Sequence, residues 1–166
     1  MRSPRYFGLL LDLGELAATL SQRPSLAKPA LVFAEGLLGQ RYRVLRRRAK
    51  QVVAQSPPSR HAVRIAAKKM RYAAEIFASL FDDRTTLRFL RSLSRLQDVL
   101  GVLNDLRVAR QRVAMLAAHA STDTTHAEGF LHGWWAAQEA SHLDRLDRRW
   151  KKVKRARIFW SADAKA

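Results

Sequence analysis

The sequence predicts an all-α fold, an antiparallel bundle of about five helices. The chain has 166 residues with only 7 glycines and 5 prolines, and 48% of its residues are hydrophobic, mainly aliphatic residues and alanine. This composition favours helices over sheets. Apolar residues recur at steps of three and four along the chain, and no run of alternating β-branched residues competes with that pattern. We therefore expect residues 1–166 to form a single helical domain.

Proline, polar and acidic breaks mark where the expected helices begin and end. Pro29 suits the first turn of the second helix, where its missing N–H costs nothing, and "SPPS" at 56–59 ends that helix. Ser59 is the expected N-cap of the third helix, and Asp123 or Thr124 can cap the fifth. The expected helices cover about residues 3–20, 28–54, 59–80, 86–118 and 124–155. Short links between long amphipathic helices predict antiparallel neighbours.

Apolar stripes and internal glycines indicate how these helices pack. Because glycine in a helix costs about 1 kcal/mol relative to alanine, Gly101, Gly129 and Gly133 predict close approach of neighbouring helices. The basic C-terminal segment could touch a membrane as an amphipathic helix, but we expect its aromatic residues to hold it against the bundle. The apolar residues behind these expectations are Leu87, Leu90, Leu93, Leu96, Leu100 and Leu103 in the fourth helix, Phe130, Trp134, Leu143, Leu146 and Trp150 in the fifth, and Phe159 and Trp160 in the tail.

The charge of the chain is strongly unbalanced. It has 31 lysines and arginines against 14 acidic residues, a formal net charge of +17, and arginine outnumbers lysine. So large an excess opposes a compact state by self-repulsion. It indicates a polyanionic partner, and nucleic acid, polyphosphate and an anionic membrane surface all remain open at this point.

Several kinds of site are excluded or disfavoured by what the sequence lacks. Cysteine is absent, so disulfides, thiolate metal sites and thiol nucleophiles are excluded. The five histidines are scattered and form no H-E-x-x-H motif, so we expect neither a metal site nor a cofactor. No apolar run reaches transmembrane length, and Asp12 and Glu15 interrupt the apolar stretch near the N-terminus. A cytoplasmic protein is therefore expected.

The segment "HAVRIAAKKMRYAAEIF", residues 61–77, concentrates positive charge on one helix. Its stripe consists of His61, Arg64, Lys68 and Arg71, with Glu75 one turn further on. The steps of three, four and three residues place the four basic side chains within about a quarter of the helix circumference. The polar face of this helix is thus almost entirely cationic.

The preceding helix repeats this arrangement. Arg43, Arg46, Arg47 and Lys50 share one of its faces. No acidic residue occurs between Glu35 and Glu75, whereas eleven lysines and arginines do. Solvated helix faces normally mix signs, because opposite charges four residues apart stabilise a helix and like charges destabilise it. As antiparallel neighbours, the two helices could place their basic stripes side by side as a cradle for a polyanion. A purely solubilising role is the alternative.

The fourth helix adds a weaker basic stripe and a short polar motif. The stripe consists of Arg84, Arg88, Arg91 and Arg95, at steps of four, three and four residues. Gln97 and Asp105 follow at helical spacing, and we expect them to fix neighbouring arginine or backbone groups rather than to bind a ligand.

These motifs resemble those of the CHAD family, the conserved histidine α-helical domain. The hallmark segment of the family has the form H-x-L-R-I-x-x-K-x-L-R-Y-x-x-E, and Val63 and Met70 stand here where leucine is usual. A second family segment, L-Q-x-x-L-G-x-x-x-D, is similar to "LQDVLGVLND" at 96–105. The matching positions are His61, Arg64, Ile65, Lys68, Arg71, Tyr72 and Glu75 in the first segment and Leu96, Gln97, Leu100, Gly101 and Asp105 in the second.

The resemblance implies an all-α fold of antiparallel helices, a basic surface cavity and binding of inorganic polyphosphate. It also implies association with polyphosphate granules as an alternative location. The ligand residues that it implies are His61, Arg64, Lys68 and Arg71, and less tightly Arg43, Arg47 and Lys50. Nothing in the chain matches the earlier half of the family domain. We therefore expect the second half alone, as a fragment, a truncated reading frame, or a unit that pairs with a second copy or with a separate N-terminal half.

Together, charge and resemblance predict non-enzymatic binding of polyphosphate in a basic groove between adjacent helices. A nucleic-acid-binding protein is the first alternative, although the basic stripes lack interleaved exposed aromatics and no known recognition motif occurs. A phosphate-processing enzyme or accessory domain is the second, but that chemistry usually needs carboxylates, and we predict no catalytic residue. The predicted binding residues are His61, Arg64, Lys68, Arg71, Arg43, Arg46, Arg47, Lys50 and Arg95.

Overall fold

The computed structural model describes residues 11, 12, 14, 15, 19, 30–117 and 125–160. The chain divides into two compact units, residues 1–33 and 34–166. The first expected helix, at 3–20, lies largely outside the described residues, and the described positions within it are helical.

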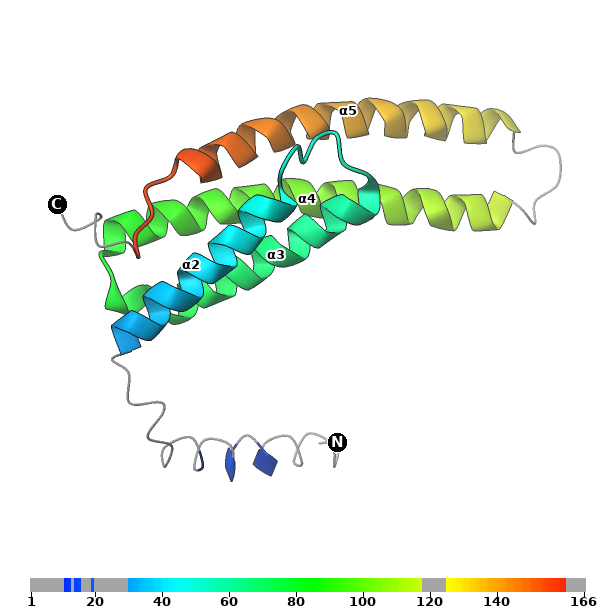
Figure 1. The fold of residues 1–166 in the computed structure, drawn as a ribbon. Helices are drawn as coiled ribbons and strands as arrows, with labels where there is room; N and C mark the ends of the chain where they lie inside the picture. Colours follow the sequence, from blue (N-terminus) through cyan, green and yellow to red (C-terminus); the bar gives the residue numbers. More distant parts are fainter. Residues whose placement is uncertain (1–10, 13, 16–18, 20–29, 118–124, 161–166) are drawn as a thin grey trace. The chain divides into compact units, whose positions relative to one another are not determined.

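Four long or medium helices and one short 3-10 helix make up the described part of the chain from residue 30 onward. They are α2 (Ala30–Arg48), α3 (Pro57–Ile76), the 3-10 helix η2 (Ala78–Leu80), α4 (Asp83–Ala117) and α5 (Thr125–Arg155). Figure 1 shows α3 and α5 running along α4 as its antiparallel neighbours. No strand occurs among the described residues, so the predicted all-α class is confirmed. None of the described helices is long and apolar enough to cross a membrane.

The link between α2 and α3 differs from the expected one. α2 ends at Arg48, and its last carbonyls are satisfied by Gln55, whose Nε2 donates to the carbonyl oxygens of Arg48 and Lys50 at 2.7 Å each. Pro57 and Pro58 then form the first turn of α3, with Ser56 rather than Ser59 at the N-cap position. Proline is tolerated there because the first N–H groups of a helix have no intrahelical partner. "SPPS" therefore begins the third helix, whereas the second has ended eight residues earlier.

The start of α4 is fixed by an aspartate cap. The Thr85 backbone N–H donates to Asp82 Oδ2 at 2.8 Å, the N-cap arrangement that satisfies one of the free N–H groups of a helix start. α4 consequently begins at Asp83, three residues before the expected start. The hydrogen bond from the Thr85 backbone lowers the pKa of the exposed Asp82 carboxyl below its ordinary value.

Because of this cap, we expect the stability of the folded protein to change with pH in the acidic range. Because the pKa of Asp82 is lower in the folded than in the unfolded chain, the ionised carboxylate stabilises the fold above the unfolded-state value of about 4, and this contribution disappears as pH falls through the folded-state pKa. We expect Asp82→Ala to lower the thermal unfolding midpoint at pH 7 and the difference from the wild type to shrink toward about pH 2. Asp82→Asn keeps an acceptor oxygen without titrating, so its advantage over Asp82→Ala should not change with pH. A constant difference between wild type and Asp82→Ala across this range would contradict the assignment.

The core of the second unit draws on all four α-helices. Its largest fully buried side chains include Leu38, Met70, Phe89 and Leu146, one from each of α2, α3, α4 and α5. The tail after α5 closes one end, because the Trp160 ring lies edge-on to Phe89 at 5.0 Å and to Tyr42 at 5.6 Å. The expectation that the aromatic tail packs against the bundle is confirmed.

Several expected packing details are wrong. Leu87 is 49% exposed, and Phe89 is buried in this part of α4 instead. In α5, Phe130 and Trp134 are 75% and 48% exposed, and Trp135 is buried. The buried face of α5 passes through Trp135, Leu146, Trp150 and Val153, and a shift of one residue turns a side chain by about 100°. Because Trp134 and Trp135 are adjacent, an error of one residue in the expected buried face selects the wrong tryptophan for the core.

The helix glycines do not mark close packing. No described atom outside the local helix lies within 4 Å of the point where a Cβ would sit on Gly101, Gly129 or Gly133. The expectation of close helix approach at these three residues is therefore wrong. At Gly101 the missing side chain instead leaves open space on α4.

Candidate polyanion-binding surface

The basic side chains of α3 follow one flank of the helix, which we call the α3 row. The row consists of His61, Arg64, Lys68 and Arg71. His61 is exposed and the other three are half-buried, while Val63, Ala67, Met70 and Ala74 hold the inner face of α3 in the core. The amphipathic sequence thus orients the helix, and this orientation keeps the four cationic groups at the surface.

The α3 row lies on the side of α3 that meets α4. His61 Nδ1 and Asn104 Oδ1 form a hydrogen bond of 3.2 Å between the two helices. One and a half turns further along α3, Gln97 Nε2 of α4 donates to the Ala67 carbonyl oxygen at 2.9 Å. The expected role of Gln97, fixing a neighbouring backbone group, is confirmed. Gly101 lies between these two contact residues of α4, so its open space adjoins the α3 row.

The two central cations of the α3 row lack acidic partners among the residues that the structure describes. Arg71 Nε pairs with Glu75 Oε1 at 3.3 Å, one turn further along the helix. Within the described part of the chain, no ion pair involves Arg64 or Lys68. An exposed pair such as Arg71–Glu75 contributes little, since it is screened by solvent. The row therefore offers uncompensated positive charge, strongest at its centre.

An exposed aromatic ring lies within the row. Tyr72 is 47% exposed, with Lys68 Nζ 5.9 Å and Arg71 Cζ 5.6 Å from the centre of its ring. The expectation that no exposed aromatic interleaves the basic stripe is wrong at this residue. Both distances fit cation–π contacts, which hold the two cations beside the ring.

The space beside His61 is shallow. A hollow between α3 and α4 is lined by Pro57, Arg60, His61 and Asn104, among others, and its volume of about 10 Å³ has room for about one water molecule. A phosphate group does not fit inside it. Any ligand of the α3 row would therefore lie on the surface of the helix pair.

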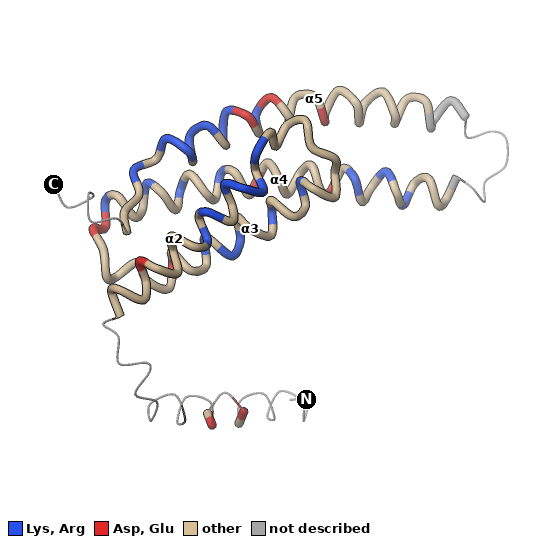
Figure 2. The backbone as a smooth tube through the Cα atoms, in the orientation of Figure 1, with Lys and Arg blue, Asp and Glu red and all other residues tan. Residues whose placement is uncertain are grey.

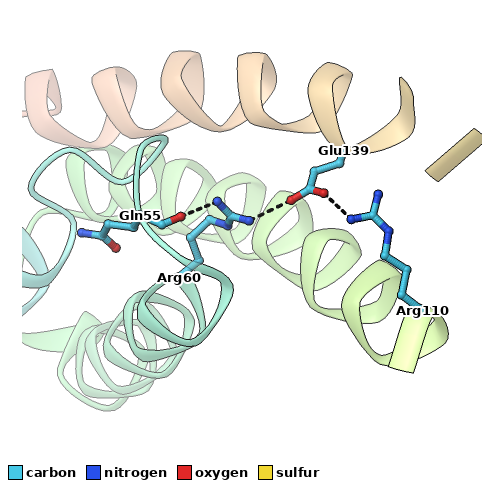
Figure 3. A network of polar contacts seen from close by, with 4 residues as sticks. All are labelled: Gln55, Arg60, Arg110 and Glu139. Carbon is cyan, nitrogen blue, oxygen red and sulfur yellow. Dashed lines mark hydrogen bonds and ion pairs between the residues drawn. The ribbon is translucent and has the colours of Figure 1, made fainter. Parts of the chain in front are cut away.

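A buried ion-pair network fixes the start of α3 next to the row. Figure 3 shows Glu139 of α5 between two arginines, accepting from Arg60 Nη2 at 2.8 Å and from Arg110 Nη1 at 2.5 Å. Arg60 Nη1 also donates to the Gln55 backbone oxygen. The Arg60 side chain is only 10% exposed. The network ties α3, α4 and α5 together at the residue that precedes His61, and sequence spacing alone gave no sign of it.

Three basic residues of α2 and Lys50, just beyond its end, form a second group, the α2 row, made up of Arg43, Arg46, Arg47 and Lys50. All four are exposed, and none takes part in an ion pair among the described residues. Figure 2 shows this basic part in the C-terminal half of α2. Arg46 also lies over the Tyr42 ring, with Cζ 5.9 Å from the ring centre.

Helix geometry turns Arg43 and Arg46 away from the contact between α2 and α3. Arg48 Nη1 donates to the Ala62 carbonyl oxygen at 3.3 Å and so marks the flank of α2 that meets α3. Arg46 lies about 160° around the helix from Arg48, whereas Lys50 follows the end of α2 in a turn. Near the other flank, Arg43 Nη1 and Trp160 Nε1 lie 3.6 and 3.9 Å from the point where a Cβ on Gly39 would sit. The apolar face of α2 sets this rotation, which directs the α2 row toward the C-terminal tail.

Arg95 belongs to a third location. It lines a hollow of about 230 Å³ between α4 and α5, together with His142, Arg145 and Arg149. Gln97, which contacts α3, is two residues away and therefore about 200° around the helix. Arg95 thus lies on the opposite side of α4 from the α3 row.

The hollows beside α5 reveal basic residues that the sequence interpretation left in the tail. Arg145, Arg149, Lys152 and Arg155 line them from the C-terminal half of α5. Figure 2 shows this concentration of basic residues in that half of the helix. Their steps of four, three and three residues are a helical signal that the sequence already contained.

Comparison with known proteins places the chain in a family. A family model for the CHAD domain matches residues 1–114, which include α2, α3 and most of α4. The crystal structure of the CHAD domain from the plant Ricinus communis is similar to this chain, with 33% sequence identity and a TM-score of 0.71, and the match covers 93% of this chain and 53% of that one. The chain thus spans about half the length of this relative. No curated protein matches the chain. The family match covers well over half of the sequence, and the chain therefore belongs to the CHAD family.

Proposed function

We propose that the protein binds inorganic polyphosphate at its surface without catalysing a reaction. The observation that carries this proposal is the pair Arg64 and Lys68, which lie one helical turn apart and have no acidic partner among the described residues. A guanidinium group can bind phosphate oxygens through two parallel N–H···O bonds, and a lysine adds a compact charge. A phosphate chain along α3 would supply the anions that the protein lacks there.

The α3 row is the main contact in this proposal, with His61 and Arg71 at its two ends. Successive turns of a helix are about 5.4 Å apart, so consecutive cations of the row can each meet one or two phosphate groups of an extended chain. The α2 row contributes to the general positive charge of the surface, and charges further than about 8 Å from the ligand are largely screened at physiological salt. Arg95 contacts the same ligand only where the phosphate chain extends around α4.

The absence of catalysis is part of the proposal. Phosphoryl chemistry usually depends on carboxylates that hold Mg²⁺ or position a nucleophile. The carboxylate nearest in sequence to the α3 row is Glu75, and it is paired with Arg71. Among the described residues, no three acidic or histidine side chains gather as a metal site would require. Phosphate release from polyphosphate that depends on Mg²⁺ would overturn this part of the proposal.

A titration with long-chain polyphosphate at several salt concentrations tests the proposed binding. We expect the logarithm of the affinity to fall linearly with the logarithm of salt concentration, because bound counterions are released when cations of the row neutralise phosphates. With about four phosphates neutralised, the affinity should fall roughly 50-fold between about 50 and 200 mM salt. An affinity that does not change with salt, or no binding at the lowest salt, would contradict the proposal. The molecular mass of the protein, measured in the same experiment, shows whether one protein chain or a pair of them binds the ligand.

Tyr72 makes nucleic acid the second candidate ligand. A partly exposed ring beside Lys68 and Arg71 is the kind of group on which a base can stack. Competition separates the two ligands. We expect polyphosphate to displace the protein from single-stranded DNA, whereas DNA at an equal phosphate concentration should displace polyphosphate poorly. The reverse order would favour nucleic acid as the ligand.

A further inference from the structure

A second basic surface runs between α4 and α5, on the side of α4 away from the α3 row. Three hollows lie along it, with volumes of about 390, 360 and 230 Å³. Lys152 lines the first and second, and Arg145 and Arg149 line both the second and the third. Hollows that share lining residues adjoin one another. They therefore form a series along α5, bounded by α4 as well in the first and third hollows, and we call this series the α4–α5 trough.

Eight of the fifteen residues that line the trough are lysine or arginine. Its main basic residues are Arg88 and Arg95 of α4 and Arg145, Arg149, Lys152 and Arg155 of α5. Asp98 is the acidic residue among the lining residues, and none of these six cations forms an ion pair within the described ranges. A seventh, Arg148, pairs with Asp144 at 2.7 Å. Most of the positive charge of the trough is thus available to a ligand.

The shape and chemistry of the trough fit a chain of phosphate groups. From His142 to Arg155 the trough follows α5 for about 20 Å. Arginine predominates, and its planar fork matches phosphate oxygens. No tyrosine, tryptophan or phenylalanine lines any of the three hollows, so stacked bases find no platform there. A linear chain of repeated anions matches a series of hollows better than a single anionic group does.

We propose that the α4–α5 trough is a second binding site for a linear phosphate chain, independent of the α3 row. The two sites are separated by the body of α4, since Arg95 faces the trough while Gln97 contacts α3. A short phosphate chain occupies one site at a time. A long phosphate chain that wraps around the helix pair occupies both sites, and binding at the second site is then favoured by the high effective concentration of the tethered ligand.

Binding stoichiometry tests this assignment. Calorimetry with a polyphosphate chain about 20 Å long, the length of the trough, should give two equivalents per protein chain at low salt. Arg145→Gln with Arg149→Gln in the trough, and Arg64→Gln with Lys68→Gln in the α3 row, should each leave one equivalent. The quadruple variant should leave none, with helix content unchanged by circular dichroism. Lys152→Gln with Arg155→Gln, two exposed residues, serves as the second trough variant should the first not fold.

The possible results separate the trough from the α3 row. A single equivalent that disappears with the α3 substitutions and survives the trough substitutions would overturn the trough and leave the proposed function standing. A single equivalent that disappears only with the trough substitutions would support the trough and remove the α3 row. Absence of binding in the wild type would overturn both. Polyglutamate of the same length should bind at least about tenfold more weakly, because carboxylates are spaced differently along it, and equal binding would overturn the assignment to phosphate.

Discussion

Reversing two charges at the centre of the α3 row, by Arg64→Glu together with Lys68→Glu, is expected to weaken binding of long-chain polyphosphate by at least about 100-fold. Each hydrogen bond to a charged group contributes about 1.5–3 kcal/mol, and about 1.4 kcal/mol corresponds to a tenfold change in affinity. The new carboxylates also repel the ligand. Binding should be measured at physiological salt, with circular dichroism to show that the helices persist.

The matched control is Lys69→Glu together with Arg112→Glu. It changes the net charge by the same amount, and both residues are exposed and lie outside the α3 row and the trough. Its effect should be only a few-fold, because Lys69 points about 100° away from Lys68 around α3 and exposed charges are screened by solvent. Equal losses in the two double variants would show that net charge rather than the row holds the ligand. That result would remove the structural basis of the proposed function.

Removing the shared acid of the buried network, by Glu139→Ala, is expected to lower the free energy of unfolding by about 2–4 kcal/mol. Glu139 balances both Arg60 and Arg110, and the Arg60 side chain is only 10% exposed. Without the carboxylate, two nearby guanidinium groups are left uncompensated, one of them away from water. For a chain of this size the thermal unfolding midpoint should fall by about 5–15 °C.

Asp144→Ala is the matched control for this effect. Asp144 pairs with Arg148 on the same helix, but both side chains are more than 60% exposed. Its loss should cost less than about 0.5 kcal/mol, as is usual for exposed pairs. Glu139→Gln should fall between the two, because it keeps the volume and one acceptor while removing the charge. Equal stability of the Glu139→Ala and Asp144→Ala variants would show that the network does not hold α3 in place.

The sequence predicted the features that depend on helical periodicity. Apolar steps of three and four gave the all-α class, and the steps from His61 to Arg71 placed four cations on one flank of α3 before any neighbour was known. The inference needed only the geometry of one helix. Gln97 was expected to fix a neighbouring arginine or backbone group, and its hydrogen bond to the Ala67 carbonyl oxygen agrees with that expectation.

The features that depend on how helices are rotated against one another could not be predicted. The α2 and α3 rows were expected side by side, but the apolar face of α2 turns Arg43 and Arg46 away from the contact between Arg48 and Ala62. Arg95 was grouped with the α3 row, although it lies beside α5. The whole apolar surface of a helix decides which face turns toward the core. When the expected face is wrong by one residue, as it was between Trp134 and Trp135, the expected direction of every polar side chain on that helix is wrong by about 100°.

The open space at Gly101 has a practical consequence. A side chain built there meets no described atom within 4 Å outside its own stretch of helix, and the sequence contains no cysteine. A cysteine introduced at this position would be the sole thiol of this sequence and could carry a fluorophore between Gln97 and Asn104, the two residues of α4 that touch α3. Its emission would then report arrival of a ligand at the neighbouring guanidinium and ammonium groups in real time, without altering any of them.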